Sequence, residues 1–397
     1  MRNTNTKIWA AAAVLGLAPL TLAQNRNSAA LRGMQINASD QALVKSYWTT
    51  DKLVNAKPLP LPGIDPVAAA ATPPANSPTV PTMPKSLPGT LPTITAGRLG
   101  NSAAERANED SQPILKMVSH AEDTTAPNFT ASALPFNNYQ VPSVNMYPYS
   151  AVGKLFFVVP PGASVSPGEY VCTGSVFYDS HTVLTARHCL YDYSSGTWYT
   201  NFVFYPAYNN GPNPAFHNGW TARALMTWTS NASSMDYDIG LLQLNDAAGW
   251  GCNGSSGTLP IWSYTGSLGV RFFGDVSEYA TIQENVFGYP QEAPFSGDTM
   301  YQDVAVVGSI NPLGTTNIVA LGNPQTGGSS GGPWIFGLDP GNAGNGSNNT
   351  INASNLITGL NSFHWTDPNQ PLTMNGPAFL GYNLWNLYTA YSQLPCY

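Results

Sequence analysis

The chain has 397 residues, enough to bury a substantial core. Only 9% of the residues are charged and the formal net charge is -7, which excludes the large basic surface that nucleic-acid binding requires. The 37 Gly, 34 Pro and 20 Tyr favour short strands joined by turns over a helical bundle. The composition therefore predicts an all-β fold.

Residues 1–23 have the pattern of a secretory signal peptide. Arg2 and Lys7 precede an apolar run that ends with the small residues Thr21 and Ala23. A membrane-spanning helix is disfavoured, because the run is short for a bilayer and no second apolar segment follows. We therefore expect a secreted, extracellular protein with neither a membrane nor a nucleic acid among its partners.

Residues 24–145 are expected to form a low-complexity pro-region. From Lys57 to Pro92, proline alternates with Leu, Ala, Thr and Ser, a composition that favours extended or disordered backbone and lacks the periodic apolar face of a packed element. The composition changes near Tyr147, just before a β-rich run. We therefore place the folded unit at residues 146–397.

Short β-rich runs follow, separated by Gly, Asn, Asp and Pro. The first set lies at residues 152–159, 170–178, 183–186, 198–205 and 239–244. The second set lies at residues 270–273, 279–289, 302–307, 317–321, 333–336 and 356–362. This spacing predicts barrels or a sandwich, and apolar residues at helical spacing within 382–394 predict one C-terminal helix.

The cysteines and the glycosylation sequons both fit a secreted protein. The four cysteines, for which three pairings are possible, are Cys172, Cys189, Cys252 and Cys396. No Cys-x-x-Cys pair is present, so metal binding is disfavoured. The Asn-x-Ser/Thr sequons, which would accept glycans, begin at Asn37, Asn128, Asn231, Asn253, Asn345, Asn348 and Asn352.

One serine lies in a glycine-rich turn, Gly328-Ser329-Ser330-Gly331-Gly332-Pro333. Glycines adopt positive φ readily, so a tight turn here can direct backbone N–H groups toward one point and form an oxyanion hole. Gly/Ser-rich loops are common, so this motif alone does not identify a catalytic serine. Support has to come from the rest of the sequence.

The same string fits Gly-x-Ser-x-Gly, the nucleophile elbow of α/β-hydrolases, in which an Asp and then a His follow the serine. The candidates after Ser330 are Asp339, His364 and Asp367. They leave too little chain for the rest of that fold. The order His188, Asp238, Ser330 matches the double-barrel peptidases instead.

The sequence around His188 resembles the histidine loop of chymotrypsin-fold serine peptidases. It runs through Cys172-Thr173-Gly174-Ser175-Val176 and then Val183-Leu184-Thr185-Ala186-Arg187-His188-Cys189. The resemblance implies a bridge between Cys172 and Cys189, which leaves Cys252 and Cys396 for each other. It also implies two six-stranded antiparallel Greek-key β-barrels, at about residues 146–255 and 256–397.

The resemblance implies a catalytic triad and acyl transfer without cofactor or metal. Ser330 is the nucleophile, His188 the general base, and Asp238 the residue that orients it, while the backbone N–H groups of Gly328 and Ser330 form the oxyanion hole. Asp236 is the competing acid, and both aspartates could instead be turn residues before a strand.

Segments around Tyr147, Gly288 and Thr326 resemble the glutamyl-endopeptidase branch of this superfamily. That branch has Thr or Ser five residues before the nucleophile and a His beside the pocket strand, whereas this chain has Gln325 and Asn361. Preference for Glu is therefore doubtful.

Cleavage after Lys or Arg is also unsupported, because Pro324 and not Asp stands six residues before the serine. The expected pocket residues are Gln325, Asn361, Ser362 and His364. Such a neutral, amide-lined pocket suits uncharged or polar side chains. The other histidines, His120, His181 and His217, are interpreted as solvated.

Ser329 stands where chymotrypsin has an Asp that pairs with a freed amino terminus, so activation must differ in detail. Residues 24 to about 145 are expected to be removable. The expected protein is a monomeric serine endopeptidase acting on proteins or peptides. A secreted serine esterase and a non-catalytic binding protein on the same fold are the alternatives.

Overall fold

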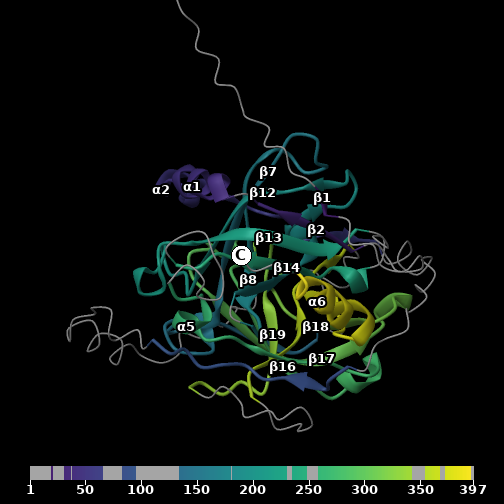
Figure 1. Ribbon diagram of the computed structural model, residues 1–397. Helices are drawn as coiled ribbons and strands as arrows, with labels where there is room; N and C mark the ends of the chain where they lie inside the picture. Colours follow the sequence, from purple (N-terminus) through teal and green to yellow (C-terminus); the bar gives the residue numbers. More distant parts are fainter. Residues whose placement is uncertain are drawn as a thin grey trace, which may run out of the picture.

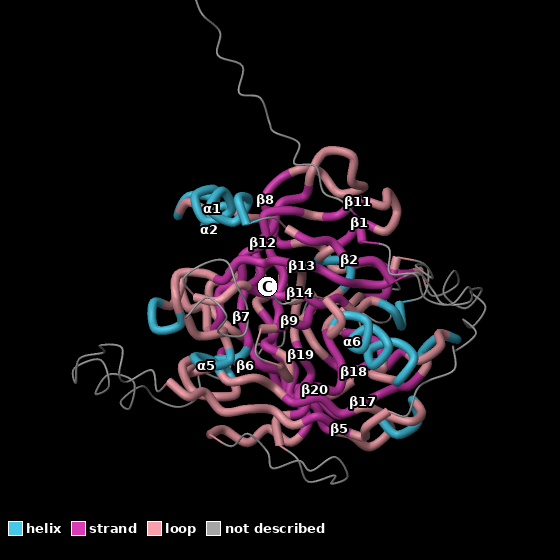
Figure 2. The backbone as a smooth tube through the Cα atoms, in the orientation of Figure 1, coloured by secondary structure: helices cyan, strands magenta, loops and turns pink. Residues whose placement is uncertain are grey.

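A computed structural model describes residues 19–20, 31–36, 38–65, 83–94, 134–179, 181–229, 235–247, 258–341, 354–366 and 372–394. The first barrel, with β7 to β14, lies above the sheet that contains β16 to β19 (Figure 1). Strands dominate, and the helices lie around the outside of the two sheets (Figure 2). No helix in these ranges is long and apolar enough to cross a membrane.

Six antiparallel strands close the first barrel, in the ring order β7-β8-β9-β14-β13-β12 and back to β7. Their bounds are β7 Val152–Val159, β8 Gly168–Val176, β9 Thr182–Thr185, β12 Thr200–Pro206, β13 Trp220–Trp228 and β14 Gly240–Leu244. Its strands carry fully buried aromatic side chains, among them Phe156, Phe204 and Trp220.

The second sheet has the antiparallel strand order β22-β18-β17-β16-β19-β20. The bounds are β16 Gln283–Gly288, β17 Tyr301–Ile310, β18 Ile318–Gly322, β19 Pro333–Phe336, β20 Leu356–Leu360 and β22 Thr373–Pro377. This half-barrel brings its two ends together at a bridge between Phe363 and Asn375.

Shorter elements complete the fold. They are β10 Tyr191–Asp192, β11 Thr197–Trp198, α5 Trp262–Thr265, β15 Gly269–Arg271, β21 His364–Trp365 and α6 Asn386–Tyr391, which a π-helical turn over Gly381–Trp385 precedes. The all-β class, the two antiparallel barrel sheets and the short C-terminal helix confirm the fold predicted from the sequence.

Parts of the predicted pro-region add to both sheets. The elements are β2 Leu31–Gln35, α1 Ala38–Tyr47, α2 Thr50–Asn55, β3 Lys57–Pro58, β4 Gly63–Ile64, β5 Ser86–Leu87 and β6 Phe136–Gln140, and β1 Pro19–Leu20 lies within the predicted signal peptide. β2 pairs with β13, β3 with β8, β5 with β15, and β6 with β17.

The proline-rich stretch is thus extended, as expected, but its described parts are packed and not disordered. Leu59 is 2% exposed and Leu87 is 8% exposed. Isolated apolar residues suffice for packing here, because the strand edges of the two sheets supply the backbone hydrogen bonds. The second predicted disulfide, His120 and the asparagines of all seven sequons lie outside the described residues.

A buried carboxyl in the second sheet makes stability depend on pH. Glu284 on β16 is 0% exposed, and its Oε1 accepts a hydrogen bond of 2.8 Å from the Thr358 hydroxyl. Burial outweighs this bond and raises the pKa of the Glu284 carboxyl to about 8. The pKa of an unfolded glutamate is about 4.3. At a pH between the unfolded and the folded pKa, the folded chain therefore holds a proton that the unfolded chain has lost.

The free energy of unfolding should therefore fall as pH rises through this window. We expect Glu284→Gln to remove part of the fall between about pH 5 and about pH 8, on the order of 2 kcal/mol in urea unfolding. The exposed Asp51→Asn change is the control. An unaltered pH dependence in Glu284→Gln would contradict the prediction.

Candidate active site

His188 and Asp238 meet at the edge of the first barrel. His188 lies in a 3-10 turn after β9, and Asp238 lies between another such turn and β14. Because β9 and β14 are neighbours in the ring, the two loops emerge together. Asp238 Oδ2 lies 2.8 Å from His188 Nδ1, and its Oδ1 accepts a 2.9 Å bond from the His188 backbone N–H.

The Asp238 carboxylate is held ionised. Burial alone would raise the pKa of this fully buried group. The charge of His188 and its hydrogen bond, with further help from Arg187 and Ser362, lower the pKa to about 2. The carboxylate therefore fixes the imidazole with Nδ1 protonated, which leaves Nε2 as the basic nitrogen.

The competing Asp236 faces a different partner. Its Oδ2 accepts a 2.5 Å hydrogen bond from the Tyr382 hydroxyl, and its backbone C=O accepts a 2.8 Å bond from Asn383 Nδ2. Asp236 thus fastens the acid-bearing loop to the C-terminal turn. The structure brings Asp238, and not Asp236, to His188.

Ser330 lies in a turn that depends on its glycines. Gly328 has φ +91° and Gly331 has φ +81°. A Cβ on Gly331 would lie only 2.1 Å from the Thr185 hydroxyl. Thr173 on β8 ties the turn to the first barrel, because its N–H donates to Ser330 O at 2.8 Å and its hydroxyl donates to Gly328 O at 3.0 Å.

The predicted Cys172–Cys189 disulfide is present and joins β8 to the histidine turn. Ser330 O lies 3.8 Å from Cys189 Sγ. A ring nitrogen of His188 and both disulfide sulfurs lie within 4.8 Å of one another. Bridged sulfurs are not thiolates, so this cluster positions side chains and does not hold a metal.

Removing this disulfide should destabilise the fold. The bridge closes a loop of sequence separation 17, which corresponds to about 3 kcal/mol in the loop-entropy account. We expect the Cys172→Ser/Cys189→Ser double variant to lose about 3 kcal/mol in urea unfolding, measured against the unmodified protein. A loss below about 1 kcal/mol would show that the bridge does not constrain the unfolded chain.

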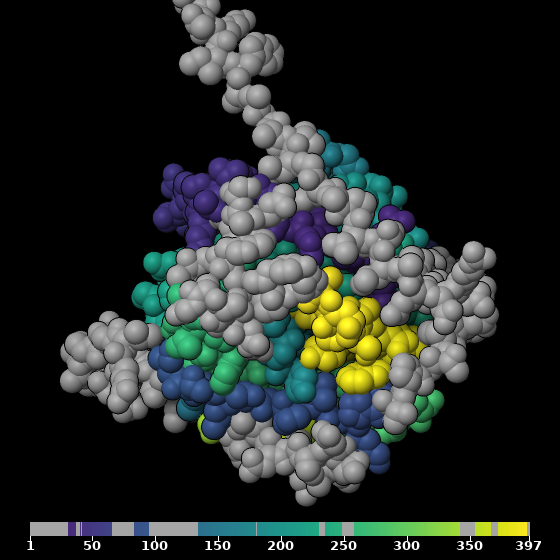
Figure 3. All heavy atoms as spheres, viewed as in Figure 1, coloured from purple at the N-terminus to yellow at the C-terminus, as the bar shows by residue number. Residues whose placement is uncertain are grey.

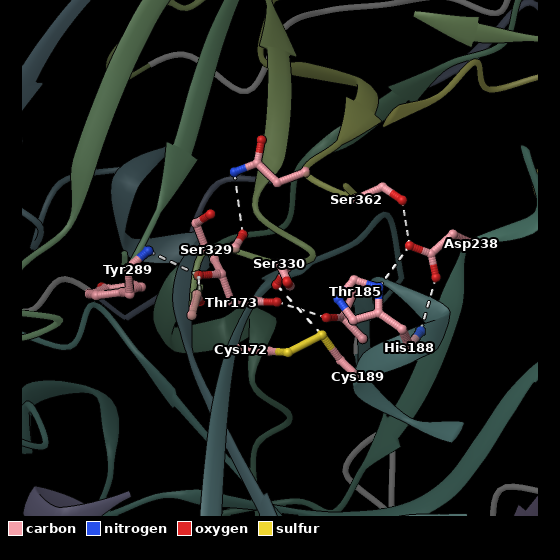
Figure 4. Close-up of a disulfide and its surroundings, with 12 residues drawn as sticks. Cys172, Thr173, Thr185, His188, Cys189, Asp238, Tyr289, Ser329, Ser330 and Ser362 are labelled. Carbon is pink, nitrogen blue, oxygen red and sulfur yellow. Dashed lines mark hydrogen bonds and ion pairs between the residues drawn. A yellow bond between two sulfur atoms is a disulfide. The ribbon is translucent and has the colours of Figure 1, made fainter. Parts of the chain in front are cut away.

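Two polar side-chain atoms of His188 and Ser330 make no hydrogen bond within the described ranges. They are His188 Nε2 and Ser330 Oγ, and both are buried. In the view of Figure 4, the His188 ring lies between Asp238 and Ser330. Catalytic hydrogen bonds are often loose before substrate binds and tighten in the complex.

The expected pocket residues separate into two groups. Gln325 and Asn361 are fully buried and lie together, with Asn361 Nδ2 3.4 Å from Gln325 Oε1 and 3.3 Å from Ser329 O. Gln325 Nε2 also donates to Asp303 Oδ2 at 2.7 Å. The neutral amide pair therefore contacts the serine turn through Asn361.

Ser362 and His364 have other contacts. The Ser362 hydroxyl donates to Asp238 Oδ2, so it supports the acid (Figure 4). His364 lies on β21, and burial lowers its pKa to about 4, which keeps the imidazole neutral. His181, expected to be solvated, is half-buried beside Gln243.

The family described as Trypsin matches residues 159–285, a range that includes His188 and Asp238 and ends before Ser330. This match confirms the resemblance to trypsin-like serine peptidases. No curated protein matches the chain.

Solved structures of proteases are similar over most of their own length. Protease Anisep from Arthrobacter nicotinovorans is 28% identical, with a TM-score of 0.48, over 64% of this chain and 98% of that one. Thermostable serine protease AL20 from an extremophilic microorganism is 26% identical, with a TM-score of 0.48, over 62% and 98%. A Glu endopeptidase in complex with MPD is 16% identical, with a TM-score of 0.45, over 64% and 97%.

Proposed function

Because residues 159–285 match the trypsin family, we propose that this chain is a secreted serine endopeptidase that works through an acyl-enzyme intermediate. The observation that carries the proposal is the 2.8 Å contact between Asp238 Oδ2 and His188 Nδ1, with Nε2 left open. The Cys172–Cys189 bridge supports an oxidising, extracellular location.

The proposed mechanism begins when substrate binds across the serine turn. Ser330 Oγ attacks the scissile carbonyl carbon while His188 Nε2 accepts the hydroxyl proton. The N–H groups of Gly328 and Ser330 stabilise the oxyanion, and His188 then protonates the leaving nitrogen. Water repeats the sequence on the acyl-enzyme, and Asp238 stabilises the imidazolium each time.

Cleavage after uncharged or polar side chains is proposed because Gln325 and Asn361 stand at the sequence positions expected for pocket residues. Residues 24 to about 145 are proposed to be a removable pro-segment, and the active form a monomer. N-terminal sequencing of the secreted protein tests the boundary: a start upstream of Ser102 would contradict it.

Comparing casein digestion with short-ester hydrolysis tests the activity. An endopeptidase should digest casein and leave internal cleavage products, and a fluorophosphonate probe should label Ser330. Ester hydrolysis without casein digestion would indicate an esterase. Absence of labelling after removal of the pro-segment would favour a non-catalytic binding protein.

A further inference from the structure

Residues 56–65, which we call the cleft segment, contact both barrels at the candidate active site. Within it, β3 runs parallel to β8 of the first barrel, and β4 runs parallel to β21, which follows the second sheet's β20. Leu59 lies between these two pairings and is 2% exposed. The cleft segment therefore extends from β8 of the first barrel to the strand that follows the second sheet.

The backbone of Leu59 binds the Gly328 N–H group, which the proposed mechanism needs for the oxyanion. Its C=O accepts a hydrogen bond of 3.2 Å from the N–H of Gly328, one of the two proposed oxyanion donors. Its N–H donates to Val171 O at 3.0 Å. The Leu59 carbonyl thus occupies an N–H donor that the oxyanion of a substrate would require. The Leu59 carbonyl and a substrate oxyanion cannot bind this N–H group at the same time.

The cleft segment makes further contacts on both sides of Leu59. The N–H of His364 donates to Pro62 O at 3.1 Å, and the N–H of Thr366 donates to Ile64 O at 3.0 Å. On the other side, Gln291 Nε2 donates to Ala56 O at 2.7 Å. Pairing of an extended chain with exposed strand edges is how folded domains commonly bind peptides.

The sequence of the cleft segment suits binding without cleavage. Prolines alternate with leucines over Pro58-Leu59-Pro60-Leu61-Pro62. Proline fixes φ, so an extended conformation is ordered at low entropic cost. The carbonyl at Gly328 belongs to the Leu59–Pro60 bond, whose nitrogen carries a ring carbon in place of hydrogen and so crowds the leaving-group side.

Helices α1 and α2 hold the cleft segment in place. Trp48, 6% exposed, packs edge-on against Phe156 of β7 with ring centroids 5.6 Å apart. Its Nε1 donates to Asn201 O, and the Tyr47 hydroxyl donates to Glu169 at 2.7 Å. The described residues between 31 and 65, purple in Figure 3, lie on the surface beside teal atoms of the first barrel.

We propose that the cleft segment is an inhibitor carried in the same chain, and that the cleft binds extended peptides rich in proline and leucine. The proposal rests on the proposed function of Ser330 and His188. Tethering gives an effective concentration on the order of 1 mM, so even a free-peptide dissociation constant of about 10 µM would favour the occupied cleft about 100-fold.

The test compares the full-length chain with its Leu59→Asp variant, which would place a charge in this buried contact. We expect a fluorophosphonate probe to label Ser330 at least about 10-fold faster in Leu59→Asp, since the tethered segment no longer competes. Val54→Asp is the matched control, because Val54 lies on the adjacent helix α2 and is 71% exposed. A synthetic peptide of residues 56–65 should slow labelling of Leu59→Asp, whereas a scrambled peptide should not.

Amide hydrogen exchange in a Ser330→Ala background reads occupancy without relying on catalysis. The N–H groups of Gly328, His364 and Thr366 should exchange faster when Leu59→Asp is added. Equal labelling and equal exchange with and without Leu59→Asp would overturn the proposal. If no chain is labelled but the exchange difference persists, the nucleophile assignment fails, and only the occupancy of the Gly328 N–H by the cleft segment is supported.

Discussion

Ser330→Ala and His188→Ala should each lower the kcat of peptide hydrolysis by on the order of a million-fold, because nucleophile and base act as one unit. Ser330 Oγ is the atom that would form the acyl bond, and His188 Nε2 is the open nitrogen that would take its proton. The measurement is steady-state hydrolysis of casein-derived peptides by the purified protein after removal of the pro-segment.

The adjacent serine is the matched control. The Ser329 hydroxyl donates to Thr326 O at 2.8 Å, so Ser329→Ala removes a bond within the turn and no reacting atom. We expect it to retain activity within about 10-fold of the unmodified protein, the cost of roughly one hydrogen bond. Retention of more than about 1% activity by a folded Ser330→Ala protein would refute the nucleophile assignment.

Asp238→Asn should lower kcat by about 10,000-fold while the protein stays folded. An asparagine can turn its NH2 group toward Nδ1, which favours the tautomer that has lost the basic Nε2. Asp236→Asn should have a far smaller effect, because an amide oxygen can still accept from Tyr382. A larger loss in Asp236→Asn would reverse the assignment of the acid.

The pH dependence of Asp238 follows from the sign of its shift. Its pKa, lowered to about 2, lies below the value of about 3.9 for an unfolded aspartate. The stability that it contributes is therefore fully present above the unfolded value and is lost as pH falls toward the folded value. Across the range in which a histidine titrates, Asp238 stays ionised.

The contacts around His188 were easier to predict from the sequence than the contacts that support Asp238. His188 beside Cys189, and Asp238 before a β-rich run, are local patterns, and the bridge and the His188–Asp238 contact follow them. The contact from Ser362 to Asp238 was missed, because it depends on where a distant loop points once both barrels have formed.

Two barrel strands were also missed, for identifiable reasons. All nine residues of β13 are buried, because β2 pairs with it and α1 packs against it. Its pattern therefore does not alternate, and Thr and Arg223 interrupt the apolar run. β22 has the sequence Thr-Met-Asn-Gly-Pro, which resembles a turn.

The docking of the cleft segment could not be predicted from the sequence, for a different reason. Leu59 lies in a short proline-rich run, and its burial accompanies backbone hydrogen bonds to Gly328 and Val171. Those partners lie far along the chain and come together only in the folded protein. A composition rich in proline therefore predicted the extended conformation but not its docking site.

The hydrogen bond from Tyr382 to Asp236 has a consequence for the timing of activity during biosynthesis. The two residues are 146 positions apart, so a ribosome-bound chain that has completed the first barrel still lacks the clamp on its acid-bearing loop. We therefore expect the acid-bearing loop to reach its final position, and hydrolysis to begin, only after synthesis has passed the second sheet.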